Sequence, residues 1–117
     1  MRLPPQGCEN LYIADFIARR SIKPVEGGFT WKFDPFMWRQ FDMQDRAPLL
    51  SNSKCPVAVM WGDRSALFNP EIQDYVKSIA PPGTPYVVIP EAEHHVMIDQ
   101  PLAFVAALRG LLAGWDI

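Results

Sequence analysis

The sequence predicts an α/β fold with two parallel strands, and three observations support this. Two uninterrupted apolar segments, residues 56–61 and 86–89, are short and partly β-branched, which is typical of strands buried on both faces of a parallel sheet. Residues 70–79, which lie between them, have helical periodicity. Two strands joined by a helix are expected to be parallel, with a right-handed crossover.

The two helices of the second half have clear start signals. Asn69 is expected as the N-cap of the helix over residues 70–79, with Pro70 as its first residue. Pro81-Pro82-Gly83 ends this helix. Pro101 opens the last helix, whose apolar positions recur at helical spacing: Phe104, Leu108, Leu111, Leu112 and Trp115.

The first half is expected to begin with a helix over residues 9–22 that Pro24 ends. Gly27-Gly28 marks a turn. Three further elements are expected in order: an extended aromatic segment over residues 29–35, a short helix over 36–43 and one helical turn over 47–53.

Composition excludes several classes of protein. With 117 residues, 49% of them hydrophobic and 21% charged, the chain has the composition of one globular domain. A net charge of −2 gives no basic surface for nucleic acid, and no apolar run approaches the roughly 20 residues of a membrane span. We therefore expect neither nucleic acid nor membrane as a partner.

The cysteines and the N-terminus favour a cytoplasmic location. Cys8 and Cys55 are the only thiols, and neither has a second ligand at metal-binding spacing. Two unpaired thiols fit a reducing compartment, and the first residues lack the apolar stretch of a signal peptide. No metal is expected, and no cofactor either, because the chain has no phosphate-binding glycine loop.

Polar residues follow both predicted strands. Gly62-Asp63-Arg64-Ser65 comes after the first strand and Glu93-His94-His95 after the second. Because ligands of parallel sheets bind beyond the carboxyl ends of the strands, we expect these two segments to lie side by side. A loop histidine there can act as a general base, with a carboxylate as its orienting partner.

Residues 90–112 resemble the C-terminal end of an α/β-hydrolase. In that family the catalytic histidine follows the last strand, with an acidic residue five positions later and a proline seven positions later, before an amphipathic final helix. His94 has this register, with Asp99 and Pro101 at those positions, whereas His95 does not. The resemblance therefore implies that His94 is the general base. Glu93 departs from the small residue that usually precedes this histidine.

The resemblance also implies a domain organisation and a partial fold. Residues 1–45 resemble the end of the mobile cap and the helix that returns to the sheet. Residues 46–117 resemble the C-terminal part of the hydrolase core. The expected fold is thus a partial α/β-hydrolase fold: two parallel strands, flanking helices and an N-terminal helical remnant of the cap.

The acid of this site is less well defined by the sequence. The family pattern after the first of these strands is Gly-x-x-Asp, and Ser65 occupies the position of that Asp. Asp63 is the nearest carboxylate and is the candidate acid, although a turn Asp often bonds its own backbone instead. Ser65 is not expected as the nucleophile, because no G-x-S-x-G surrounds it or occurs elsewhere in the chain.

Other residues have structural and functional interpretations. Trp31, Phe36 and Trp38 fit packing, or an apolar pocket for an acyl or aromatic substrate. Asp99 fits a helix cap better than a catalytic acid.

The leading hypothesis is the C-terminal fragment of a serine hydrolase for small esters or similar acyl compounds, inactive on its own. The alternatives are a fragment of an Asp-nucleophile hydrolase, as in haloalkane dehalogenases and epoxide hydrolases, and a non-catalytic α/β binding or interaction module. Two strands buried on both faces need further neighbours. We therefore expect the isolated chain to fold poorly or to self-associate through an exposed sheet edge.

Overall fold

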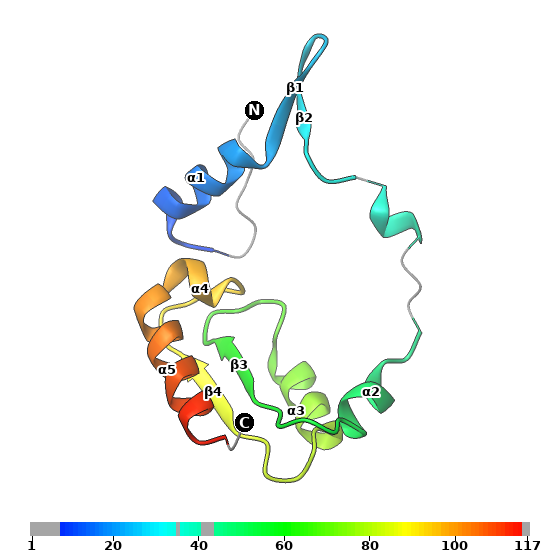
Figure 1. Ribbon diagram of the computed structural model, residues 1–117, viewed down its shortest axis with the longest axis vertical. Helices are drawn as coiled ribbons and strands as arrows, with labels where there is room; N and C mark the ends of the chain where they lie inside the picture. The colour runs from blue at the N-terminus through cyan, green and yellow to red at the C-terminus, as the bar shows by residue number, and fades with distance from the viewer. Residues whose placement is uncertain (1–7, 35, 41–43, 116–117) are drawn as a thin grey trace.

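The computed structural model describes residues 8–34, 36–40 and 44–115 (Figure 1). The centre of the second half is a parallel pair of strands, β3 (Val59–Gly62) and β4 (Tyr86–Ile89), in which Val59 lies opposite Tyr86 and Gly62 opposite Ile89. The predicted parallel pair is therefore confirmed. The first strand begins at residue 59 instead of 56, because its partner begins only after Pro85, whose carbonyl accepts the hydrogen bond from the Val59 N–H.

The two helices predicted beside this sheet are present. Helix α3 (Pro70–Ile79) has the predicted bounds, and the Asn69 side chain accepts a hydrogen bond from the Ile72 N–H at 3.0 Å, as an N-cap does. Helix α5 (Pro101–Ala113) begins at the predicted proline and packs on β4.

One additional turn of helix, α4 (Val96–Asp99), precedes α5 and was not predicted. The two helices remain separate because a residue before proline disfavours the helical conformation, and Gln100 has φ −129° and ψ 64°.

The buried core is small and lies between β4 and the last two helices. Ile89, Ala92 and Val96 form its centre. Met60 and Phe104 are among the partly buried residues that pack against it. On β3, the buried Trp61 ring lies 5.1 Å from the Phe68 ring and 6.4 Å from the Tyr86 ring, measured between centroids.

The first half differs from the prediction at one element. Helix α1 (Leu11–Arg20) is present, but it ends two residues early, and β1 (Ile22–Val25) pairs antiparallel with β2 (Gly28–Trp31). Pro24, which the sequence predicts as the end of a helix, lies within β1 instead. A two-stranded hairpin tolerates its missing N–H because both strands are edges. The predicted turn is confirmed, and Gly27 takes the positive φ of 81° that favours glycine.

Two short helices lie in the chain between the hairpin and the sheet (Figure 1). The 3₁₀-helix η1 (Met37–Gln40) occupies part of the predicted helix over 36–43, of which residues 41–43 lie outside the described residues. Helix α2 (Ala47–Ser51) is the predicted turn over 47–53.

The described chain is more extended than a compact domain. Its radius of gyration is 17.2 Å and its extents are 53 × 34 × 30 Å, whereas a compact domain of this length has a radius of gyration of about 13 Å. Large apolar side chains remain exposed on α1, the hairpin, β4 and α5, among them Leu11, Phe29, Val88 and Leu102. None of the described helices is long and apolar enough to cross a bilayer.

Candidate functional site

The turns that follow β3 and β4 meet at the carboxyl end of the sheet, as predicted. The Asp63 N–H donates to the Ile89 carbonyl at 3.1 Å, which continues the pairing of the strands by one residue. The Arg64 N–H then donates to the Ala92 carbonyl at 3.0 Å. The histidine-bearing loop is therefore held against the turn after β3 by backbone hydrogen bonds.

Gly62 permits this close approach. A Cβ atom at position 62 would collide with the backbone carbonyl oxygens of Ala92 and Glu93. These atoms belong to the loop backbone and have no flexible side chain that could move aside. The glycine at the end of β3 therefore determines how near His94 comes to the first turn.

Ser65 and His94 are brought together at this point. Ser65 is buried, with 8% of its surface exposed, and its Oγ lies 3.3 Å from Nδ1 of His94. The Oγ also accepts a hydrogen bond from the Phe68 N–H at 3.2 Å. His94 is itself exposed, so its imidazole is accessible to solvent while Nδ1 is in contact with Ser65.

His95, the neighbour of His94, has a different position. It is half-buried at the N-cap of α4, where its carbonyl accepts hydrogen bonds from the N–H groups of Ile98 and Asp99. The two imidazole rings lie edge to face, with 5.3 Å between centroids.

Asp63, the candidate acid, is directed at the loop backbone. Its Oδ1 accepts a hydrogen bond from the Ala92 N–H at 3.2 Å. Among the described residues, the hydrogen-bond partner of His94 is the Ser65 hydroxyl and not a carboxylate. In this conformation Asp63 positions the loop that carries His94.

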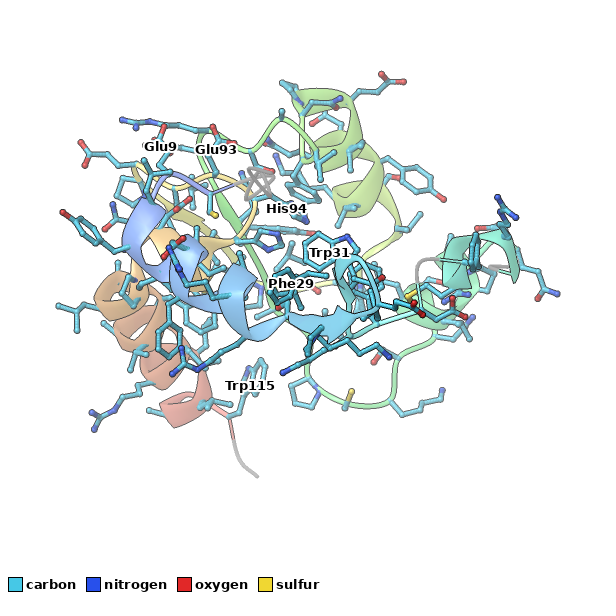
Figure 2. The ribbon with its side chains drawn as sticks, turned by 90° about the horizontal axis from the view of Figure 1, so that it is seen from above. Glu9, Phe29, Trp31, Glu93, His94 and Trp115 are labelled. Atoms are coloured by element: carbon cyan, nitrogen blue, oxygen red, sulfur yellow. The ribbon has the colours of Figure 1, made fainter. Side chains whose placement is uncertain are left out.

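Asp99 binds two backbone segments, the one that leads into α1 and the loop before His94. Its Oδ1 accepts hydrogen bonds from the N–H groups of Glu9 at 2.6 Å and Asn10 at 2.9 Å, and its Oδ2 accepts one from Glu93 at 2.9 Å. We call these bonds, together with the ion pair of 2.7 Å between Arg64 and Glu9, the Asp99 network. Figure 2 shows Glu9 and Glu93 beside each other, with His94 next to them.

The expectation that Asp99 caps a helix is wrong, because α5 has no side-chain cap and both Asp99 oxygens are taken by other segments. The sequence points to Asp99 because it lies five residues after His94, as the acidic residue does in the α/β-hydrolase pattern. Its partners Glu9 and Asn10 are about ninety residues away, and no local pattern indicates such a pairing.

The same network affects a thiol. Burial, followed by the charges of Asp99 and Glu93, raises the pKa of Cys8 above its ordinary value. Cys8 is therefore a poorer nucleophile than an ordinary thiol at neutral pH.

The candidate substrate-binding aromatic residues lie apart from the histidine loop. Trp31 belongs to β2, in the hairpin that projects away from the β3–β4 sheet in Figure 1, and its ring lies 5.2 Å from that of Phe33. Phe36 is exposed, with the Arg39 guanidinium 4.7 Å above its ring. The Trp38 side chain lies outside the described residues.

No protein-family model and no curated protein matches the sequence. A solved structure does match: the crystal structure of E-2-(acetamidomethylene)succinate hydrolase, with a TM-score of 0.71 and 24% identity. The match covers 86% of this chain and 40% of that chain, so this chain spans less than half the length of its structural relative. That relative is an α/β-hydrolase. The strand order, the flanking helices and this match together show that the chain has a partial α/β-hydrolase fold.

Proposed function

We propose that this chain supplies the general-base histidine, His94, of a serine hydrolase for esters or similar acyl compounds. One observation carries the proposal: the exposed His94 ring stands at the carboxyl end of the parallel sheet, with Nδ1 held by Ser65. Because Nδ1 has a protein partner, Nε2 is the nitrogen left to meet a nucleophile and substrate.

The chemistry assigned to His94 conserves protons at each step. Nε2 takes the proton of a serine hydroxyl while the serine oxygen bonds to the acyl carbon, and then gives that proton to the leaving group as its bond to the acyl carbon breaks. Nε2 next takes a proton from water as the water oxygen bonds to the acyl carbon, and returns that proton to the serine oxygen as the acyl–serine bond breaks. The sequence has no G-x-S-x-G, so we assign the serine to a segment outside this sequence.

The test uses the longest polypeptide whose reading frame contains this sequence. Hydrolysis of p-nitrophenyl acetate and of E-2-(acetamidomethylene)succinate is measured, together with labelling by a fluorophosphonate that reacts with activated serines. We expect His94→Ala to abolish turnover and labelling, and His95→Ala to retain most of both. Loss of activity in the His95 variant alone would overturn the assignment of the base.

Two alternatives give different outcomes in the same experiment. With an Asp nucleophile, the protein turns over substrate, but the fluorophosphonate does not label it. A non-catalytic module is folded but shows neither turnover nor labelling. The serine at position 65 favours this last alternative over a hydrolase with a carboxylate partner for its histidine.

A further inference from the structure

Among the described residues, the Ser65 hydroxyl has two hydrogen-bond partners, and their chemistry determines whether it donates or accepts. The Phe68 N–H, 3.2 Å from Oγ, is a backbone donor and can only donate. The other neighbour, Nδ1 of His94 at 3.3 Å, donates or accepts according to where the ring carries its proton. Ser65 is also buried, so a hydroxyl proton without an acceptor would cost free energy.

Only one ring tautomer satisfies all three groups. When Ser65 donates its hydroxyl proton to Nδ1, Oγ still accepts from Phe68, and His94 carries its proton on Nε2. In the opposite tautomer Nδ1 donates to Oγ, and the buried hydroxyl proton loses its acceptor.

A carboxylate at this place would impose the opposite tautomer, because it only accepts hydrogen bonds and so requires a proton on Nδ1. The two aspartates beside the loop are bound to backbone N–H groups in this structure and not to His94. Asp63 accepts from Ala92, and Asp99 accepts from Glu9, Asn10 and Glu93.

We propose that Ser65 is the positioning residue of His94, and that it holds the resting ring in the tautomer with the proton on Nε2. If His94 acts as the general base proposed above, the arriving serine hydroxyl must donate to Nε2. The ring proton then moves to Nδ1, and Ser65 changes from donor to acceptor. Because the resting proton is on Nε2, the resting tautomer cannot accept the serine proton and is inactive. A hydroxyl can change from donor to acceptor and so allow the active tautomer, whereas a carboxylate only accepts.

The test is ¹⁵N NMR on the full chain labelled at histidine, in solution for a monomer and by magic-angle spinning of the sedimented material for an assembly. At about pH 8.5, where an imidazole is ordinarily neutral, we expect His94 to show an unprotonated Nδ1 and a protonated Nε2. We expect Ser65→Asp to reverse this pattern. Ser65→Ala should move the His94 signals toward those of the chain in urea.

Two controls separate this effect from a general change of structure. His95 has no hydrogen bond to Ser65 among the described residues, so its pattern of protonated and unprotonated nitrogens should be the same in the folded wild type and in both Ser65 variants, and serves as an internal reference. Ser78→Ala removes a hydroxyl that donates to the Tyr75 carbonyl on exposed α3, and should leave both histidines unchanged.

Three outcomes would overturn the proposal: a protonated Nδ1 on wild-type His94, wild-type His94 signals equal to those in urea, or the same His94 signals in wild type and both Ser65 variants. None of these measurements needs turnover. The tautomer can therefore be correct while the hydrolase assignment fails, and the reverse also holds.

Discussion

At the scale of single residues, Asp99 has more polar partners than any other side chain near His94. Both of its oxygens accept backbone hydrogen bonds, two on Oδ1 and one on Oδ2. An ionised carboxylate suits this role because it offers acceptor sites on both oxygens and has no proton to place. The loop carrying His94 is thus tied to the segment that leads into α1.

We expect Asp99→Asn to lower the free energy of unfolding by about 1–3 kcal/mol, because one oxygen becomes an NH₂ group that faces a backbone donor. Denaturant titration followed by tryptophan fluorescence measures this. Asp74→Asn is the matched control, since Asp74 is exposed and its nearest cation, Lys77, is 4.0 Å away. An equal effect of both substitutions would contradict the role given to the Asp99 network.

Cys8 provides a second prediction for a single residue. Since burial and the two carboxylates raise its pKa, alkylation of Cys8 by iodoacetamide should have its pH midpoint above that of a short peptide with the same cysteine. Its raised pKa also means that thiolate formation at high pH favours the unfolded chain, so this contribution to stability is lost as pH rises. A Cys8 midpoint at or below that of the peptide would contradict the assignment.

At the scale of elements, the site depends on how closely β3 approaches the loop after β4. Gly62→Ala places a methyl group against the carbonyls of Ala92 and Glu93, so we expect a loss of about 1–3 kcal/mol in the free energy of unfolding. Amide exchange should also become faster in residues 92–95.

Gly110→Ala is the control for this glycine. Nothing lies within 4 Å of a Cβ at position 110, which is in the last turn but still within α5. Alanine there should stabilise the chain by about 0.5–1 kcal/mol. Two substitutions of the same kind are therefore expected to have opposite signs, and equal signs would rule out the close approach at Gly62.

Elements with local signals could be predicted from the sequence. Asn69 and Pro70 define the start of α3, and the apolar run 86–89 has the bounds of β4. That Ser65 and His94 lie near each other followed from parallel topology, because both come after strand ends. The hairpin was only partly predicted, since Pro24 ends helices more often than it occupies strands. The Asp99 network was not predictable, because its partners are distant in the sequence.

At the scale of the whole molecule, the parallel sheet has only two strands among the described residues. Its apolar surface is incompletely covered, and Val88 on β4 is 49% exposed. An uncovered strand of this kind pairs readily with another chain. We propose that the isolated chain self-associates through this sheet.

A lysine in the strand should oppose that association. We expect Val88→Lys to shift the chain toward monomer in sedimentation velocity, because a charge on an exposed strand disfavours pairing. Leu102→Lys adds the same charge at an exposed position of α5, away from the strand, and should leave the association unchanged. A wild-type chain that is a monomer with one sharp unfolding transition would contradict the proposal.

The Asp99 network also closes the chain into a ring without a covalent bond. Two of its hydrogen bonds, those from Glu9 and Asn10, and one exposed ion pair cross this closure. They contribute of the order of 2–4 kcal/mol, and about 4 kcal/mol corresponds to a dissociation constant near 1 mM. A contact this weak persists only because the intervening backbone keeps the segment before α1 at a high local concentration near Arg64 and Asp99. A single tryptic cut after the exposed Arg39 should therefore release α1 and the hairpin at micromolar concentration. His94 would then lose a support located at the other end of the sequence.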